Sequence, residues 1–410
     1  MGTAVGPDGS NGKSLYKLRT KNGVNFSGLP FPGIEMDERV LVTDGDYRQA
    51  LAITRSLGRK GITVDVMSHF SRSIAFHSRY CSGKILTNPP GCGGEFGDRM
   101  LDQVYSGEYR LLLPVGLEAN MEASRIRDRL ERHVSVPVPD AETMERAARK
   151  DLCIEVADEA GVPAPRTLQP STLRDAVSSA DALGFPVVVK AVIGSGGGGV
   201  RIARSPEEFR ESYLALDRHH SRPLVQEYVP GSGYGYSALA EDGKPLAEVS
   251  HMRIHELPPE GGPSTMARSL DIPVVKEMGR KILRQLGWTG VAMVEFRGPP
   301  GRSGSDLLDF KLIEINPKFW GSLDLAVAAG VDFPYLTYLK FTGRPVEPVH
   351  SQRDVTFRWI YTDLVYALET GQIAKYLINY LRPSVKSDLD MDDPGPLACT
   401  LRKILGEAHR

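Results

Sequence analysis

The chain has few cysteines and no pair of them at a metal-binding or redox spacing. Its 410 residues contain four cysteines, scattered at Cys81, Cys92, Cys153 and Cys399. Without a Cys-x-x-Cys pair we expect no structural zinc site, and four isolated cysteines do not make a disulfide framework. Free cysteines are typical of proteins in a reducing compartment, so the expected location is the cytoplasm.

The sequence also lacks a long apolar run. No stretch approaches the ~20 apolar residues needed to cross a bilayer, and the first residues lack the basic-then-apolar pattern of a signal peptide. We therefore expect no membrane partner.

Neither sign of charge is in excess. Lys and Arg total 50, Asp and Glu total 51, and hydrophobic residues make up 41%. Proteins that bind a nucleic-acid backbone normally carry a basic excess or a basic face, so we expect no nucleic-acid partner. At ~100–200 residues per domain, a chain of this length predicts two or three packed units.

Common catalytic motifs are missing as well. The chain has no Gly-x-Ser-x-Gly elbow and no paired Cys–His signature, and its glycine-rich loop at 194–199 lacks the Gly-Lys-Ser/Thr of a Walker loop. Catalysis through a serine or cysteine nucleophile is therefore not expected. Any phosphate-binding loop must be of another kind.

What is present begins with a tail. Residues 1–36 are rich in Gly, Asn, Ser and Lys with little apolar periodicity, which predicts a mobile N-terminal segment. Residues 39–43 then resemble a buried strand, 47–60 a helix and 62–67 a second strand. This order predicts a parallel sheet, and the pattern continues with a strand at 110–114 and a helix at 120–133. We expect an α/β domain over 37–135.

After a helical stretch at 141–161, the predicted pattern changes from alternating strands and helices to paired strands. Residues 185–192 and 199–203 resemble strands on either side of a glycine-rich loop at 194–199, the pattern of an antiparallel hairpin. Two more hairpins are predicted, one over 235–255 turning at 241–243 and one over 290–316 turning through 298–305. Helical stretches return after 345. The expected units are therefore 136–345, with a small subdomain near 165–230, and a C-terminal helical segment at 346–410.

Acidic residues interrupt two of these predicted strands. Glu295 lies in an apolar strand, and its presumed partner strand contains Glu314 and Asn316. Side chains alternate along a strand, so Glu314 and Asn316 share a face, which Glu295 joins if the strands pair. Two carboxylates and an amide oxygen are ligands that Mg²⁺ prefers. The alternative is that these are edge-strand residues facing water.

A lysine immediately precedes the glycine-rich loop. Lys190 interrupts an apolar strand, and the loop contains Gly196, Gly197 and Gly198, whose amides can approach phosphates closely because no side chain obstructs them. A flexible hairpin tip would explain the loop equally well. A cation and a metal on opposite sides of a triphosphate would, however, neutralise its charge, which favours a nucleotide site.

Taken in order, these segments resemble the ATP-grasp superfamily. The resemblance runs through Lys150, 187–190, 194–199, 224–231, 294–296 and 313–317, and it covers roughly 37–345. Residues 317–322 resemble the branch related to carbamoyl-phosphate synthase and biotin carboxylase domains, which includes many carboxylate–amine ligases. The implied fold is an α/β protein. Its parts would be an N-terminal, Rossmann-like pre-ATP-grasp domain and an ATP-grasp module of two α+β subdomains whose antiparallel sheets clamp ATP.

The resemblance also implies roles for single residues. Lys150 and Lys190 would contact the nucleotide phosphates, and Glu227, Tyr228 and Val229 would meet adenine. Magnesium, with manganese able to substitute, would be held by Glu295, Glu314 and Asn316. The substrates would be a small carboxylate and an amine, with amino acids among the candidates, and the assembly that the resemblance implies is a homodimer.

Two positions depart from the family pattern. Lys318 stands where many relatives have arginine; lysine keeps the charge but cannot make a planar bidentate contact. Gly233 stands where several relatives place a ribose-binding glutamate, so another group or water would hold the ribose.

Two polar segments remain. His251, Arg253 and His255 would share one strand face in the region where the family builds its substrate pocket, and Arg268 follows in the next segment. We expect Arg253 and Arg268 to bind a substrate carboxylate, and with Lys318 they are the candidates to stabilise an oxyanion. The alternative for the strand is a solvated face. The acidic run 388–393 lacks the glycine and terminal glutamate of an EF-hand, so a solvated turn is predicted.

The function that these observations favour is an ATP-dependent carboxylate–amine ligase working through an acyl phosphate. One competitor is the activation of bicarbonate or carbamate, which the absence of a recognisable biotinyl or glutaminase domain disfavours. Another is a regulatory protein that binds nucleotide without turnover, which the intact Lys190, Glu295, Glu314 and Asn316 disfavour.

Overall fold

The computed structural model describes residues 38–89, 94–194, 199–218, 222–259, 261–301, 307–347, 349, 351, 354–380 and 382–407. These residues belong to one compact unit. The tail predicted at 1–36 and the glycines Gly196, Gly197 and Gly198 lie outside the described residues.

The first part of the unit is a parallel sheet of order β3-β2-β1-β4. Its strands are β1 (Arg39–Val42), β2 (Thr63–Ser68), β3 (Cys81–Leu86) and β4 (Tyr109–Leu113). The accompanying helices are α1 (Arg48–Gly58), η1 (Ile74–His77), α2 (Glu95–Ser106), α3 (Leu117–Arg125) and α4 (Arg127–Leu130). The predicted parallel sheet is confirmed, whereas β3 and α2 were not foreseen. The single helix predicted at 120–133 is two helices, because the chain leaves helical geometry at Ile126 (φ −103°, ψ 16°).

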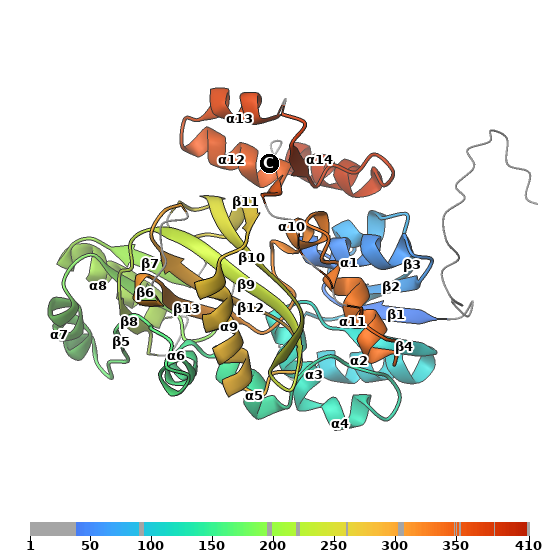
Figure 1. Ribbon diagram of the computed structural model, residues 1–410, viewed down its shortest axis with the longest axis horizontal. Coiled ribbons are helices and arrows are strands. Elements are labelled where there is room, and N and C mark those ends of the chain that lie inside the picture. The colour runs from blue at the N-terminus through green and yellow to red at the C-terminus, as the bar shows by residue number, and fades with distance from the viewer. Residues whose placement is uncertain are drawn as a thin grey trace, which may run out of the picture. The chain divides into compact units, whose positions relative to one another are not determined.

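Helix α1 forms because its apolar residues recur at helical spacing. Ala50, Ile53 and Leu57 are fully buried on the side that packs on the parallel sheet. The opposite side carries arginines, and the C-terminal part of the chain covers it. This helix therefore lies between the parallel sheet and the C-terminal segment (Figure 1).

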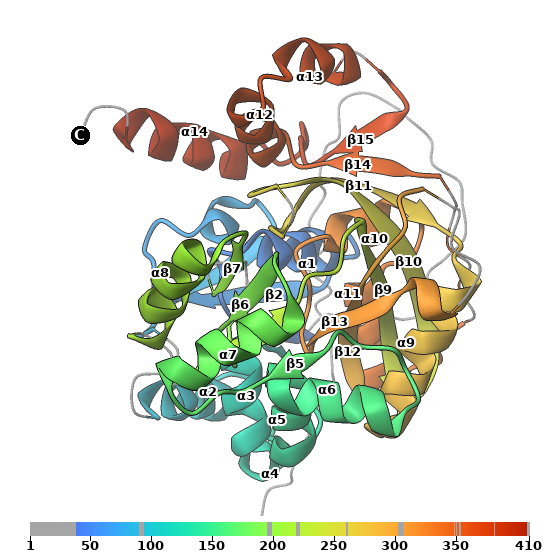
Figure 2. The same ribbon diagram turned by 90° about the vertical axis from the view of Figure 1, so that its left-hand side faces the viewer.

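A small antiparallel sheet follows the helices α5 (Ala141–Ala148) and α6 (Lys150–Glu159). Its order is β5-β8-β6-β7, with β5 (Thr167–Leu168), β6 (Val187–Lys190), β7 (Val200–Ala203) and β8 (Leu224–Glu227). Helices α7 (Leu173–Leu183) and α8 (Pro206–Asp217) pack on one face of this sheet, as Figure 2 shows. The β6–β7 hairpin expected around the glycine-rich loop is confirmed.

A seven-stranded sheet of order β13-β12-β9-β10-β11-β14-β15 forms the centre of the unit. Its strands are β9 (Ser232–Glu241), β10 (Lys244–Glu256), β11 (Ser264–Leu270), β12 (Gly290–Gly298), β13 (Lys311–Asn316), β14 (Thr356–Arg358) and β15 (Val385–Ser387). Neighbours are antiparallel except β14 and β15. Both predicted hairpins are confirmed, and the first turns at Asp242 and Gly243, which have positive φ (47° and 74°).

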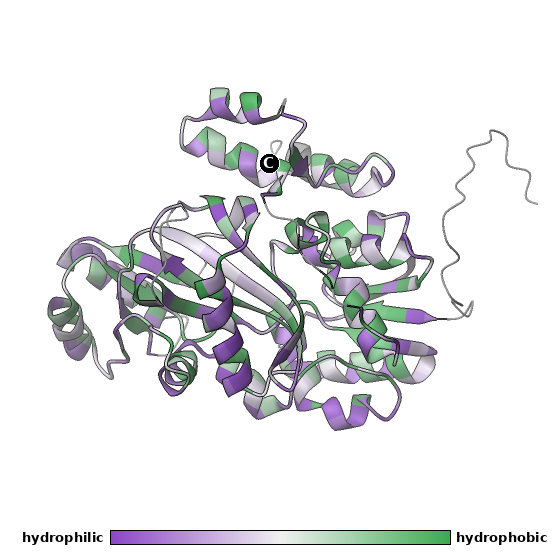
Figure 3. Ribbon diagram, in the orientation of Figure 1, coloured by the Kyte–Doolittle hydropathy of each residue, from purple (hydrophilic) through white to green (hydrophobic). Residues whose placement is uncertain are grey.

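Helix α9 (Pro273–Gln285) covers one face of this sheet and contacts β9, β10 and β12. Val275, Met278 and Ile282 are fully buried against the sheet, while the outward side of the helix is hydrophilic (Figure 3). The remaining elements between β12 and β14 are η2 (Leu307–Asp309), α10 (Leu323–Ala328) and α11 (Phe333–Phe341).

The C-terminal segment contains α12 (Ile360–Glu369), α13 (Ile373–Tyr380) and α14 (Gly395–Glu407), as its helical pattern predicted. It also contributes β14 and β15 to the central sheet, which was not foreseen. The division of the chain at 136 and 346 stays a prediction.

The acidic run at 388–393 is not a solvated turn, and that expectation was wrong. Asp393 is 1% exposed, and its carboxylate accepts hydrogen bonds from Arg55 Nε (2.9 Å) and Ser78 Oγ (2.8 Å). Asp390 also pairs with Arg55 (3.5 Å) and with Arg59. The run is bound because Arg55 of α1 and Arg59, the residue that follows α1, both pair with it, a contact between segments over 300 residues apart. Among the described residues, no helix is both long and apolar enough to cross a membrane.

Candidate active site

A cavity of about 520 Å³ lies between the two antiparallel sheets and the start of α1. Most of the predicted site residues line it. They are Lys190, Glu227, Tyr228, Val229, Arg253, Glu295, Glu314, Asn316 and Lys318.

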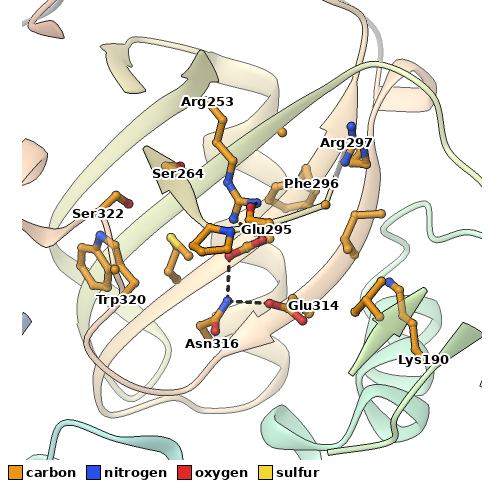
Figure 4. Close-up of a pocket in the computed structure, with 18 of the residues that line it drawn as sticks. Lys190, Arg253, Ser264, Glu295, Phe296, Arg297, Glu314, Asn316, Trp320 and Ser322 are labelled. Carbon is orange, nitrogen blue, oxygen red and sulfur yellow. Dashed lines mark hydrogen bonds and ion pairs between the residues drawn. The ribbon is translucent and has the colours of Figure 1, made fainter. Parts of the chain in front are cut away.

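The acidic residues meet at the middle of the cavity because β12 and β13 pair as expected. Glu295 lies opposite Glu314 in the antiparallel register, and Met293 lies opposite Asn316. The Asn316 side-chain amide donates to Glu295 Oε1 (3.0 Å) and to Glu314 Oε1 (3.1 Å), as Figure 4 shows. The three side chains named from the alternation of the strands therefore converge.

Cationic side chains surround this acidic centre of Glu295, Glu314 and Asn316. Arg253 Nη2 pairs closely with Glu295, and Lys150 Nζ lies 3.6 Å from Glu314 Oε2. Burial raises the pKa of Glu295 in spite of Arg253. Burial opposes ionisation of Glu314 too, but Lys150 and Lys190 outweigh it and lower the pKa of Glu314. Glu314 is therefore the more firmly ionised of the two carboxylates.

The two predicted phosphate-binding lysines approach from different elements. Lys150 begins α6, and its Nζ donates to Gly194 O (2.9 Å), which ties it to the start of the glycine-rich loop. Lys190 ends β6 and is 4% exposed. Burial and the nearby Lys150 lower the pKa of Lys190 to about 8. Burial destabilises the charged form of a lysine, so an anion bound beside such a lysine stabilises that charged form strongly.

Lys318 and Arg253 are two further cations that line the cavity. Lys318 is 7% exposed, and burial lowers its pKa. Arg253 also donates from Nη1 to Gly262 O (3.2 Å), and its Nε finds no hydrogen-bond partner among the described residues. Both residues line the cavity, and Arg253 is paired there with Glu295.

The segment expected to meet adenine ends β8 and lines the cavity near Lys190. The Glu227 carboxylate accepts a hydrogen bond from Lys311 Nζ at Oε1 (2.8 Å) and one from the Arg166 backbone amide at Oε2 (3.0 Å). The hydrogen bond from Lys311 is the main cause of the lowered pKa of Glu227. With its carboxylate engaged in this way, Glu227 offers the cavity mainly its backbone.

The acidic centre fits a magnesium ion. Its donors are two carboxylates and an amide, and turning the Asn316 amide by 180° would present Oδ1 beside the carboxylates, since the two amide orientations have nearly the same shape. This oxygen set is one that Mg²⁺ prefers and that leaves coordination positions for phosphate. No group of three or more His, Cys, Asp or Glu side chains suited to a metal occurs among the described residues.

Some predicted residues are not brought to the cavity. Arg268 points to Asp354 (Nε to Oδ1, 3.3 Å), its side chain is 44% exposed, and it does not line the cavity. His251 is buried with Nε2 3.3 Å from Ser322 Oγ, and burial lowers its pKa to about 3, which keeps the ring neutral. The solvated strand face considered for His251 is therefore wrong.

The absence of a side chain at Gly233 has a local cause. A Cβ atom at this position would lie 2.5 Å from Glu256 Oε1 and 2.8 Å from Arg253 Cδ. The Arg253 and Glu256 side chains thus occupy the space that a residue larger than glycine would need.

Several residues of the cavity wall were not predicted from the sequence. Arg48 comes from the start of α1, and Trp320 and Ser322 come from the loop after β13. Arg48 follows the loop at the carboxyl end of the first parallel strand. Open α/β sheets bind ligands at this edge, so the position of Arg48 in the sequence could have suggested that it belongs to the site.

Two family models match overlapping parts of the chain. Residues 149–226 match the model for the carbamoyl-phosphate synthase L chain, ATP binding domain. Residues 219–362 match the model for ATP-grasp in the biosynthetic pathway with Ter operon. Together they cover the small sheet, the strands of the central sheet other than β15, and the acidic centre.

Relatives and solved structures agree with these matches. Biotin carboxylase 1 of Bacillus subtilis is 28% identical over 193 residues, which are 40% of this chain and 40% of that protein. The chain thus spans about two fifths of this relative. The biotin carboxylase–β-γ-ATP complex from Campylobacter jejuni has a TM-score of 0.63 at 15% identity and covers 78% of this chain and 74% of its own. An L-amino acid ligase from Bacillus licheniformis has a TM-score of 0.57 at 14% identity, covering 77% and 79%. At these identities the structural likeness concerns the fold.

Proposed function

Because the chain is a member of the ATP-grasp superfamily through residues 149–362, we propose that it is an ATP-dependent carboxylate–amine ligase that forms an amide or peptide bond through an acyl phosphate. The observation that carries the proposal is the convergence of Glu295, Glu314 and Asn316 in a cavity also lined by Lys190 and Lys318. Such a set of opposite charges is suited to a triphosphate with a metal ion.

In the proposed reaction a substrate carboxylate oxygen attacks the γ-phosphorus of ATP. The bond from the γ-phosphorus to the β–γ bridging oxygen breaks, and ADP leaves with the bonding electron pair. Lys150 and Lys190 bind phosphate oxygens and stabilise the charge that moves toward ADP. Glu295, Glu314 and Asn316 would hold Mg²⁺, or Mn²⁺ in its place, which supplies charge neutralisation for the triphosphate when bound.

An amine then attacks the acyl carbon, the carbon–oxygen bond to phosphate breaks, and inorganic phosphate leaves while the amine loses a proton to solvent. Lys318 and Arg253 would stabilise the oxyanion of this step. Arg268 would contribute only if the segment around β11 moved, because its guanidinium now pairs with Asp354. The backbone of residues 227–229 would contact adenine.

Hydroxylamine tests the proposal directly. With ATP, magnesium and the correct acid but no amine, hydroxylamine should trap the acyl phosphate as a hydroxamate with stoichiometric ADP. A screen of amino acids and small carboxylates, singly and in pairs, would find the acid by ADP release. AMP and pyrophosphate as products would show adenylation and would contradict the mechanism.

A second candidate is the activation of bicarbonate or carbamate, which the similarity to biotin carboxylase favours. The same assay separates the two, because that reaction would show ADP release dependent on bicarbonate alone. A protein that binds ATP and releases no ADP under any of these conditions would instead be a regulatory relative.

A further inference from the structure

Arg48 lies at the end of the cavity that the proposed ligase reaction leaves without a role. It occupies the first position of α1, and its Nη2 donates to Ser264 O (3.1 Å). It also abuts the loop after β13, since a Cβ on Gly321 would lie 2.8 Å from Nη2. In Figure 4, Ser264, Trp320 and Ser322 lie across the acidic centre from Lys190. Arg48 is therefore at the opposite end from the nucleotide-binding groups.

The Arg48 guanidinium uses few of its hydrogen-bond donors within the protein. Within the described part of the chain, its side chain makes the single hydrogen bond to Ser264 and no ion pair at 4.0 Å or less. A guanidinium has five N–H donors, so most of them are not used by the protein. Burial lowers the pKa of Arg48 to about 10, which leaves it charged at neutral pH. A largely buried cation with unused donors is stabilised by an anion that enters the cavity.

The C-terminal segment holds this guanidinium in place. Arg48 stacks on Trp359 with its Cζ 4.2 Å from the ring centroid, and Trp359 Nε1 donates to Asp324 Oδ2 (3.0 Å). Asp324 and Asp388 act on Arg48 electrostatically from beyond ion-pair distance, whereas Arg253 repels it. The stacking fixes the orientation of the planar guanidinium, whose paired N–H groups match the two oxygens of a carboxylate.

The carboxylates that line the cavity do not pair with the guanidinium. Ser264, Ser322 and Thr362 contribute hydroxyl groups, and Trp320 contributes an aromatic wall. Among the described residues that line the cavity, the carboxylates are Glu227, Glu295 and Glu314. Glu227 is paired with Lys311, Glu295 with Arg253 and Glu314 with Lys150. This end therefore offers a substrate the Arg48 cation and hydrogen-bonding hydroxyls, while the nearby Arg253 is engaged by Glu295.

We propose that Arg48 binds a substrate carboxylate that does not react, so that the Arg48 end of the cavity selects anionic substrates. This rests on the proposed ligase function and specifies its substrate class. The carboxylate belongs either to a second acidic group on the acid or to an amino acid that serves as the amine. The reacting carboxylate itself lies nearer Lys318 and the acidic centre.

Two matched pairs of probes distinguish these sources. Glutarate and glutaramate differ by one carboxylate replaced with an amide, and so do alanine and alaninamide. Binding of each is measured by calorimetry with a non-hydrolysable ATP analogue and magnesium present. The wild-type protein should bind the carboxylate member of one pair about tenfold or more tightly, the size expected for a charged hydrogen bond. The pair that shows the preference identifies the source.

Arg48→Met should abolish this preference while ATP-analogue binding stays unchanged. Arg48→Lys should keep part of it, because the charge remains without the planar fork. Arg125→Met is the matched control, since that arginine is 66% exposed on α3 and far less buried, and it should behave as wild type. Thermal unfolding of each variant shows whether it folds, and if Arg48→Met does not, Arg48→Lys carries the test.

The inference would be overturned by an undiminished preference in folded Arg48→Met, or in Arg48→Lys if Arg48→Met does not fold. It would also be overturned if the wild type showed no preference in either pair. ADP release is measured separately on the same samples. An Arg48-dependent preference without any ADP release would contradict the ligase and leave the anion site standing. ADP release that is equal in wild type and Arg48→Met would support the ligase reaction and would contradict a role of Arg48 in binding its substrate.

Discussion

At the scale of single residues, the site depends on buried carboxylates that lie beside buried cations. Glu314 is the central case, because Lys150, Lys190 and the Asn316 amide all act on it. These partners keep it ionised although it is buried, and an ionised carboxylate is what a magnesium ion requires.

Glu314→Gln should reduce ADP formation roughly 100-fold or more while the protein remains folded. The substitution keeps the shape of the side chain but removes a charge from the predicted metal site. Glu295→Gln should show a smaller loss. Steady-state ADP release with thermal unfolding as a folding check measures both, and wild-type turnover in both variants would show that the metal site is wrongly assigned.

Lys190 predicts a pH dependence of nucleotide binding. Its pKa in the free protein is lowered to about 8 by burial and by Lys150, and bound triphosphate raises it. ATP affinity should therefore be full below pH 8 and fall as the pH rises above 8, at most about tenfold per pH unit. Lys190→Arg stays charged over this range and should bind ATP with a nearly flat profile between pH 7.5 and 9.5. Equal profiles for the two proteins would remove Lys190 from the phosphate site.

At the scale of elements, the run 388–393 acts as a clamp between the C-terminal segment and α1. Burial opposes ionisation of Asp393, but hydrogen bonds from Arg55, the Arg79 amide and Ser78 outweigh it and lower its pKa. A carboxylate with a lowered pKa adds stability at neutral pH that is lost as the pH falls through that pKa.

Asp393→Asn should lower the free energy of unfolding by about 1.5–3 kcal/mol, since it weakens a charged hydrogen bond to the buried Arg55. It should also reduce the loss of stability on acidification. The neighbouring Asp392 has an exposed side chain, so Asp392→Asn is the matched control and should leave stability nearly unchanged. Chemical denaturation at pH 7 and at pH 4 measures both effects, and equal stabilities for the two variants would contradict the clamp.

At the scale of the whole molecule, the C-terminal segment is part of the central sheet. β14 pairs with β11 through Met266, Ala267 and Arg268, and Phe357 and Trp359 join a buried cluster with Ala267 and Leu325. Strand pairing and shared core contacts of this kind are not those of a separable domain.

A chain ending at residue 350 should therefore be less stable and more prone to aggregate, because it exposes the edge of β11 and the apolar face beneath Trp359. Thermal unfolding and size-exclusion chromatography against the full chain measure this. A truncated protein that unfolds at the wild-type temperature and elutes as one species would show that the segment is dispensable for the fold.

The sequence by itself determined the elements and the local pattern of the acidic centre. The side-chain period of two places Glu314 and Asn316 on one face of β13, and the hairpin signals bring β12 beside it, so their convergence was predictable. Local rules also predicted the parallel sheet and the β6–β7 hairpin, because both depend on spacing along the chain.

Contacts between distant segments were decided by the tertiary structure. Arg48 and Trp359 are over 300 residues apart, and their stacking depends on how α1 packs beneath the C-terminal segment. The same packing turned a predicted solvated turn into a buried clamp at Asp393. It also turned Arg268 toward Asp354 and away from the cavity. No local periodicity encodes these choices, because each depends on which side chains the completed fold places within reach, and that packing involves the whole chain.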